Sequence, residues 1–250
     1  LALNLGAEGQ VAEQVALLRK VTELGDTKPG TRMGLAIALG LQGDYPAAEQ
    51  ALAGAGALAP DEPDIAAARG FLASLEGNLD AARDQLSAAV QGAASVQREA
   101  TTRLGIILVG QGRFQEAEPY LAKASADRGN TTAMFYHAVC LNALGNLPQA
   151  RAEFDEVARQ AGPLAVQATI RAADLRIAEG RLQEALDALN KLNAAGQAPS
   201  AALFVVRARA AMHSGEDDKA RDALKRALEL DAQYAPAHLE NGLLLIKQQF

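Results

Sequence analysis

A six-residue pattern recurs along the chain at nearly constant spacing: glycine, four other residues, then alanine. Its six copies read GDYPAA, GNLDAA, GRFQEA, GNLPQA, GRLQEA and GEDDKA, and they begin at residues 43, 77, 112, 145, 180 and 215. Consecutive glycines are therefore 34, 35, 33, 35 and 35 residues apart. A period in this range indicates an array of similar supersecondary units that stack on one another. A degenerate copy at Gly9 has Gln14 in place of the alanine.

Each repeating unit carries the signals of two helices. An apolar-periodic segment precedes the glycine, as in TTRLGIILVGQG at 101–112, and this spacing is typical of an amphipathic helix. Glycine readily ends a helix in the left-handed conformation. Pro46 and Pro148 follow their glycines by three residues, where the first turn of a second helix tolerates proline. The repeated alanine then falls on the inner face of that second helix and lets the two antiparallel helices approach closely.

The composition supports an all-α fold. About half of the chain is hydrophobic, but only 4% is aromatic and there is no Trp. The apolar residues are mostly Ala and Leu, which favour helix over sheet.

These features resemble the tetratricopeptide repeat family, whose 34-residue unit has Leu-Gly in its first helix, Gly at the turn and Ala in its second helix. The matching residues are Leu104, Gly105, Leu108, Gly112, Phe114 and Ala117 in one unit, Gly145, Ala150 and Phe154 in the next, and Gly215, Ala220 and Ala227 in a third. The resemblance covers essentially the whole chain. It implies an all-α, right-handed superhelical solenoid of antiparallel helix pairs.

The repeat positions predict one solenoid over residues 1–250, with six full repeats and a partial unit at each end. The full repeats are expected at 29–62, 63–97, 98–130, 131–165, 166–200 and 201–234, and the partial units at 1–28 and 235–250. The first partial unit would be a second helix at about 9–25, and the last would be a lone first helix. The departures from the family pattern are expected to mark looser units or edges of the groove, and they are Arg69, Arg207, Asp217 and Pro119. Pro119 is also expected to kink its helix.

The two ends of the sequence suggest a piece of a longer or processed protein, because the first residue is Leu1 rather than Met. Leu1, Leu3 and Leu5 at one end, and the run Leu243 to Ile246 at the other, lack a complete helix pair to cover them. Solenoid termini need polar caps to stay soluble. We therefore expect the native protein to continue in at least one direction, or its ends to stack on another chain.

Charge and cysteine content limit the partners and the compartment. The net charge is −6 with a pI near 5.2, which argues against broad binding of nucleic acid or anionic membranes. No apolar run approaches the roughly 18–20 residues that span a bilayer. The one cysteine, Cys140, cannot form an intramolecular disulfide and leaves the compartment open. The 17 Arg against 7 Lys suggest a GC-rich bacterial genome. By analogy with bacterial arrays of the family, the periplasm or cell envelope is expected rather than the cytoplasm.

No constellation of residues predicts an enzyme, a metal site or a cofactor. His137, His213 and His238 lack the spacing of metal ligands and are expected to be helix-surface or partly packed residues. Cys140 follows Val139 on a first helix and is interpreted as a small buried hydrophobe. The many acidic residues are interpreted as solvated faces.

A recognition surface is the better-supported hypothesis. The resemblance implies that first helices line the concave surface and that residues two, three, six, ten and thirteen positions before each marker glycine tend to face it. The predicted partner-binding residues are Phe135, Tyr136, Val139, Asn142, Ile170, Arg171, Asp174, Val205, Arg209, Met212 and His213. Phe71, Leu75, Thr102 and Ile106, with Arg103 adjacent, are the matching residues in earlier repeats. This mixed apolar surface suits an extended or helical peptide. The alternative is ordinary packing between repeats.

One subclass of the family is not expected here. Some members grip the C-terminal carboxylate of chaperones with Lys and Asn on successive first helices. The matching positions here hold Met33, Ala67, Thr102, Phe135, Ile170 and Val205, without a lysine.

The leading functional hypothesis is a non-enzymatic protein–protein interaction scaffold in bacterial envelope, pilus, secretion or exopolysaccharide assembly, by analogy with the family. One alternative is the scaffold region of a larger enzyme or polysaccharide-export protein. A second alternative is a structural protein that assembles end to end.

Overall fold

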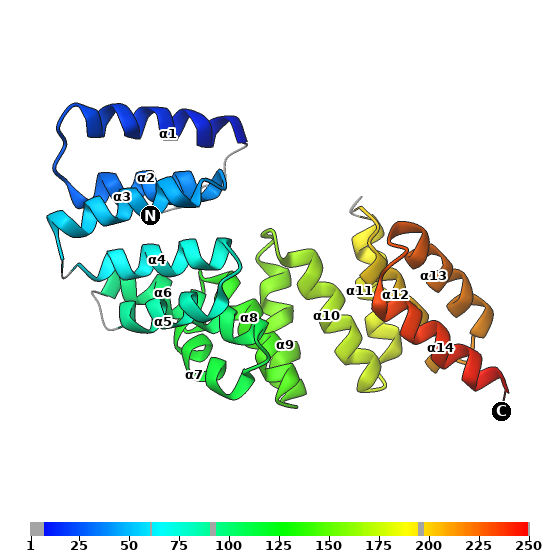
Figure 1. Ribbon diagram of the computed structural model, residues 1–250. Coiled ribbons are helices and arrows are strands. Elements are labelled where there is room, and N and C mark those ends of the chain that lie inside the picture. Colours follow the sequence, from blue (N-terminus) through cyan, green and yellow to red (C-terminus); the bar gives the residue numbers. More distant parts are fainter. Residues whose placement is uncertain (1–7, 61, 91–93, 195–197, 250) are drawn as a thin grey trace. The chain divides into compact units, whose positions relative to one another are not determined.

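The computed structural model describes residues 8–60, 62–90, 94–194 and 198–249, and every regular element in these ranges is an α-helix (Figure 1). The chain divides into two compact units, Leu1–Asp127 and Arg128–Phe250. The first unit contains α1 (Glu8–Glu23), α2 (Pro29–Leu41), α3 (Tyr45–Leu58), α4 (Pro63–Leu75), α5 (Leu79–Ala89), α6 (Ala94–Gly110) and α7 (Phe114–Ser125). The second contains α8 (Thr131–Ala143), α9 (Leu147–Arg159), α10 (Ala165–Ala178), α11 (Leu182–Ala194), α12 (Ala201–His213), α13 (Asp217–Leu230) and α14 (Ala235–Gln249).

The helices pack as the predicted pairs. The first helices α2, α4, α6, α8, α10 and α12 each pack against the helix that follows them. The all-α repeat array expected from the sequence is therefore confirmed. Its handedness along the whole chain stays a prediction.

The marker glycines end the first helices in the left-handed conformation, as predicted. Gly43, Gly77, Gly112, Gly145, Gly180 and Gly215 have φ between 72° and 83°. Residues with a Cβ are strained at such angles. Pro46 and Pro148 lie in the first turn of α3 and α9, again as predicted.

The repeated alanine explains how closely the two helices of a pair approach. It is fully buried in all six copies, at Ala48, Ala82, Ala117, Ala150, Ala185 and Ala220. One turn further on, each second helix buries a large apolar side chain, such as Leu121 of α7. A Cβ added at Gly105 of α6 would lie 2.5 Å from Cγ of Leu121. Glycine at that position therefore leaves the space that the leucine fills.

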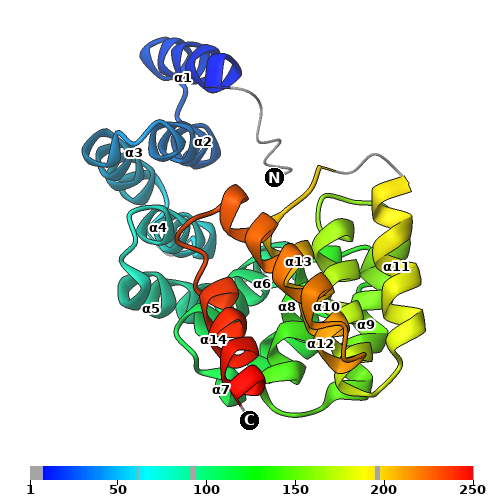
Figure 2. The ribbon, with the colours of Figure 1, turned by 90° about the vertical axis from the view of Figure 1, so that its right-hand side faces the viewer.

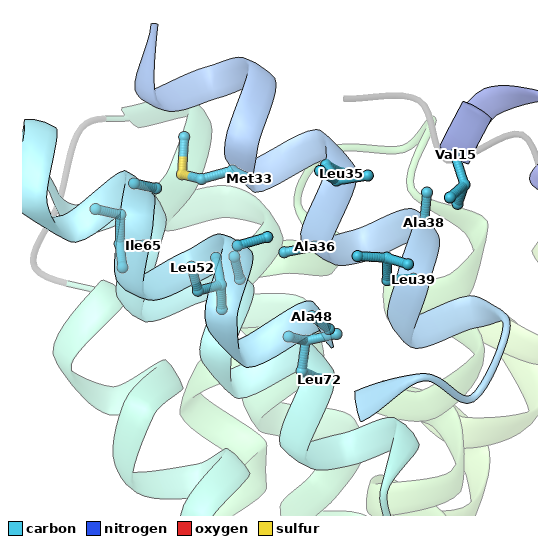
Figure 3. Packing of buried hydrophobic residues seen from close by; sticks show 13 residues of the cluster. Val15, Met33, Leu35, Ala36, Ala38, Leu39, Ala48, Leu52, Ile65 and Leu72 are labelled. Carbon is cyan, nitrogen blue, oxygen red and sulfur yellow. The ribbon is translucent and has the colours of Figure 1, made fainter. Parts of the chain in front are cut away.

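Apolar side chains from successive helices form shared buried clusters within each unit. In the first unit, Val15 of α1, Met33 of α2, Leu52 of α3 and Leu72 of α4 belong to one buried cluster (Figure 3). Because this cluster joins consecutive helix pairs, each pair is stabilised mainly by its neighbours, as expected for a stacked array.

The structure places two helix boundaries differently from the sequence prediction. Helix α6 begins at Ala94, inside the segment assigned to the preceding repeat. Helix α7 includes Pro119 without a break, and a kink at this residue stays a prediction. Helix α1 ends at Glu23 rather than near residue 25. At the chain ends, Leu1, Leu3 and Leu5 lie outside the described residues, whereas Leu243, Leu245 and Ile246 of α14 are exposed and Leu244 is buried.

Candidate interaction surface on the first helices

The predicted partner-binding residues lie on the first helices of the second unit. Helices α10, α12 and α14 pack in succession (Figure 2), and side chains of α8 and α10 meet in one apolar cluster. We call the accessible predicted residues on α8, α10 and α12 the first-helix face.

Three of the predicted residues are buried between successive first helices. Phe135, Ile170 and Val205 are only 6%, 6% and 3% exposed. All three lie ten residues before a marker glycine. Each belongs to an apolar cluster that includes residues of the next first helix. Packing between repeats, the alternative interpretation, therefore accounts for this position.

Eight predicted residues remain accessible and define the first-helix face. They are Tyr136, Val139 and Asn142 on α8, Arg171 and Asp174 on α10, and Arg209, Met212 and His213 on α12. The ring of Tyr136 packs edge-on against the buried Phe135, with centroids 5.5 Å apart. The face thus combines apolar side chains with a few charged groups. Its role in binding stays a prediction.

One arginine connects three first helices on this face. The Nη1 atom of Arg209 donates to both carboxylate oxygens of Asp174, at 2.8 and 2.7 Å, and its Nε donates to Oε1 of Glu240, at 2.7 Å. The side chains of Asp174 and Arg209 are 30% exposed, and that of Glu240 is 8% exposed. Partial burial would lower the pKa of the Arg209 guanidinium, but its bonds to Asp174 and Glu240 outweigh burial and raise that pKa.

The sequence signal for this link is incomplete. Asp174 and Arg209 are 35 residues apart, one repeat length, so opposite charges at equal phase predict a contact between stacked helices. Glu240 lies only 31 residues after Arg209, about one helical turn short of a repeat. Its role was not predicted. The cluster of two carboxylates and one guanidinium carries one net negative charge at neutral pH.

In the first unit, an arginine on α6 also connects two first helices, through a contact with an aromatic ring of α4. The guanidinium carbon of Arg103 lies 4.2 Å from the centroid of the Phe71 ring, within the range of a cation–π interaction. The Nε atom of Arg103 also donates to Glu99 at 2.6 Å. Phe71 and Thr102 are buried, while Leu75 and Ile106 are partly exposed.

The histidines and the cysteine serve local packing and hydrogen bonding. His137 is buried, and its Nδ1 lies 2.8 Å from Glu153 of α9. It therefore differs from the helix-surface His213 and His238, which contact backbone carbonyls at 3.0 and 2.9 Å. Cys140 is fully buried, as predicted. Within the described ranges, no three His, Cys, Asp or Glu side chains gather in a way that could hold a metal ion.

A search of the described helices found none that is both long and apolar enough to cross a membrane.

Family comparisons agree with the repeat architecture. Sequence models described as the tetratricopeptide repeat match residues 29–53, 102–165, 143–202 and 201–234. Together these matches cover more than half of the chain. No curated protein sequence matches it.

Several solved structures share the fold. A chain of the APC/C hetero-tetramer Cut9–Hcn1 superposes with a TM-score of 0.72 at 15% identity, over 95% of this chain and 46% of that chain. PilF of Pseudomonas aeruginosa has a TM-score of 0.68 at 20% identity, over 86% of this chain and 98% of its own. PilW, described as a type IV pilus biogenesis factor, has a TM-score of 0.67 at 19% identity, over 84% and 97%. Identities this low establish the fold alone.

Proposed function

Because the chain belongs to the tetratricopeptide repeat family, we propose that it is a non-catalytic scaffold whose first-helix face binds a segment of a partner protein. The observation that carries this proposal is the contrast among the predicted residues. Phe135, Ile170 and Val205 are held in the core, while Val139, Asp174 and Arg209, each four residues further on, are partly exposed. The scaffold thus fixes the backbone and leaves a variable set of side chains for recognition.

The chemistry of the face defines the kind of partner. Val139 and Met212 offer apolar contact area, and Asn142 offers an amide that both donates and accepts hydrogen bonds. Asp174 and Glu240 are already bonded to Arg209 and carry one net negative charge with it. A peptide with alternating apolar and polar residues, and a cation close to Asp174, would complement this face.

We also infer a role in assembling the bacterial cell envelope. PilW, whose fold resembles this one, is described as a type IV pilus biogenesis factor. The arginine-rich, lysine-poor composition is compatible with a bacterial source. Finding the chain and its partner in a cell-envelope fraction would support this role, and a partner confined to the cytoplasm would contradict it.

The binding role can be tested with single charge-introducing variants. Val139→Glu and Met212→Glu place a carboxylate on the first-helix face, whereas the matched Lys225→Glu changes an exposed residue of α13. We expect the first two to weaken recovery of the partner at least about tenfold, or about 1.4 kcal/mol, with helicity unchanged by circular dichroism. Equal recovery by all three variants would reject the first-helix face as the binding site.

A further inference from the structure

A cleft of about 680 Å³ lies between the second helices α9 and α11, with α10 as its floor. Thr169 and Arg176 of α10 lie at its base. Arg176 is two residues from Asp174, so the two side chains point about 200° apart around the helix. The cleft is therefore separate from the first-helix face.

One small side chain at the base of the cleft, Thr169, stands where the next first helix has a large one. Thr169 of α10 corresponds, 35 residues later, to Phe204 of α12. Ala172, the counterpart of Arg207, is buried in an apolar cluster with residues of α8 and α9 and does not line the cleft. The Nη2 atom of Arg207 reaches the carbonyl of Leu189 in α11, at 3.4 Å. The ring of Phe204 lies 6.0 Å from the guanidinium of Arg226 in α13. An aromatic ring and a guanidinium thus occupy the space between α11 and α13.

Ion pairs hold the floor of the open cleft in place. The Nη2 atom of Arg176 donates to both oxygens of Asp155 in α9, at 2.9 Å each. Its Nε lies 3.9 Å from Glu184 in α11. The Arg176 side chain is only 15% exposed. Arg176 forms ion pairs with Asp155 of α9 and with Glu184 of α11, on the two sides of the cleft. Because these pairs fix the spacing of α9 and α11, the cleft is preorganised.

The two ends of the cleft carry opposite charges. Helices α9 and α11 run in the same direction, because one reversed helix separates them. Arg159 and Lys191 lie near the C-terminal ends of α9 and α11, whereas Glu184 lies in the first turn of α11 and Asp187 lies three residues further on. Arg159 also donates to Glu156 of its own helix. The apolar lining residue Ala188 lies between Asp187 and Lys191, and Ala158 and Leu192 are the direct neighbours of Arg159 and Lys191.

We propose that this cleft is a second docking site, for an amphipathic helix of a partner protein. The helix inserts an aromatic or leucine side chain above Thr169, in the kind of space that Phe204 fills one repeat later. It places acidic residues toward Arg159 and Lys191 and a basic residue toward Asp187. This is the helix-in-groove mode of recognition, with the charged ends setting the direction of the bound helix.

A displayed library of helical peptides of about 16 residues, or about four turns, provides the probe. It is selected on the intact 250-residue chain, and the enriched peptides are titrated against variants. We expect peptides with one aromatic or leucine anchor and opposite charges at their two ends. Thr169→Phe should fill the cleft and weaken their binding at least tenfold. Lys191→Glu, which changes an exposed side chain and leaves the packing intact, should weaken it several-fold.

Control variants separate this site from the first-helix face. Val139→Glu should leave binding of these peptides unchanged. Phe204→Thr combined with Arg207→Ala should open a matching cleft between α11 and α13 and raise the number of peptides bound per chain. The proposal is overturned if selection enriches no peptide, if Thr169→Phe and Lys191→Glu both bind like wild type, or if Val139→Glu abolishes binding.

Discussion

Gly105 and Gly242 occupy equivalent places in two first helices, but their surroundings differ. Gly105 lies seven residues before Gly112, and Gly242 lies seven residues before Gln249, which is 34 residues after Gly215. A Cβ at Gly105 would lie 2.5 and 2.6 Å from Cγ and Cδ2 of Leu121, whereas a Cβ at Gly242 would meet nothing within 4 Å. Helix propensity favours alanine over glycine by roughly 1 kcal/mol in both places. The packing around each glycine therefore decides whether a substitution by alanine stabilises or destabilises the fold.

We therefore expect Gly105→Ala and Gly242→Ala to change stability in opposite directions. Gly105→Ala should lower the free energy of unfolding by about 1–3 kcal/mol, because the added methyl displaces a fully buried leucine. Gly242→Ala should raise it by up to about 1 kcal/mol. Chemical denaturation followed by circular dichroism measures both, and a stabilising Gly105→Ala would contradict the close approach of α6 and α7.

Helices α10, α12 and α14 are linked by the side chain of Arg209, which bonds Asp174 on one side and Glu240 on the other. The Glu240 side chain is 8% exposed, so removal of its cationic partner leaves a poorly solvated carboxylate. The effect is smaller than for a fully buried pair, because Arg209 itself is 30% exposed.

Arg209→Met should consequently lower the free energy of unfolding by about 1–2 kcal/mol. In the double variant Arg209→Met/Glu240→Gln the unpaired charge is gone, so part of this loss should be recovered. A double-mutant cycle in urea measures the coupling. Strictly additive effects of the two substitutions would show that the ion pair does not hold these helices together.

Much of the element-scale structure follows from the sequence, because the repeat depends on local physics. The glycine turns and buried alanines arise within each unit, so their positions could be counted from the period. The exposure of first-helix residues could not be predicted from the period, because it depends on how the next first helix packs against them. Phe135 and Val139 lie one turn apart on α8, yet only Phe135 is covered. The α9–α11 cleft was not predicted for a related reason. Thr169 indicates an open space only when it is compared with Phe204, the residue at the same position of the next repeat.

At the scale of the whole molecule, acid should destabilise both units through paired surface carboxylates. A hydrogen bond from Arg113 lowers the pKa of Glu116 in the first unit, and one from Arg181 lowers the pKa of Glu184 in the second. Because the folded pKa values lie below the ordinary value of 4.5, these pairs stabilise the fold fully above that pH. Their contribution is lost as pH falls through the lowered values.

The midpoint of thermal unfolding should therefore decrease as pH is lowered from about 5 to about 3. Calorimetry over this range measures the decrease. Glu116→Gln and Glu184→Gln should each make the decrease shallower, since the amide has no proton to gain. A midpoint that does not change with pH would contradict the role of these ion pairs.

The central claim is that recognition takes place on the first-helix face of the second unit. Site-specific photo-crosslinking in the source organism tests it most directly, with the reactive residue placed at Val139 or Met212 on that face, or at Lys225 on α13 as the control. We predict that Val139 and Met212 crosslink to the same partner protein and that Lys225 does not. Crosslinks to that partner from Lys225 alone, or none from either face position, would contradict the claim.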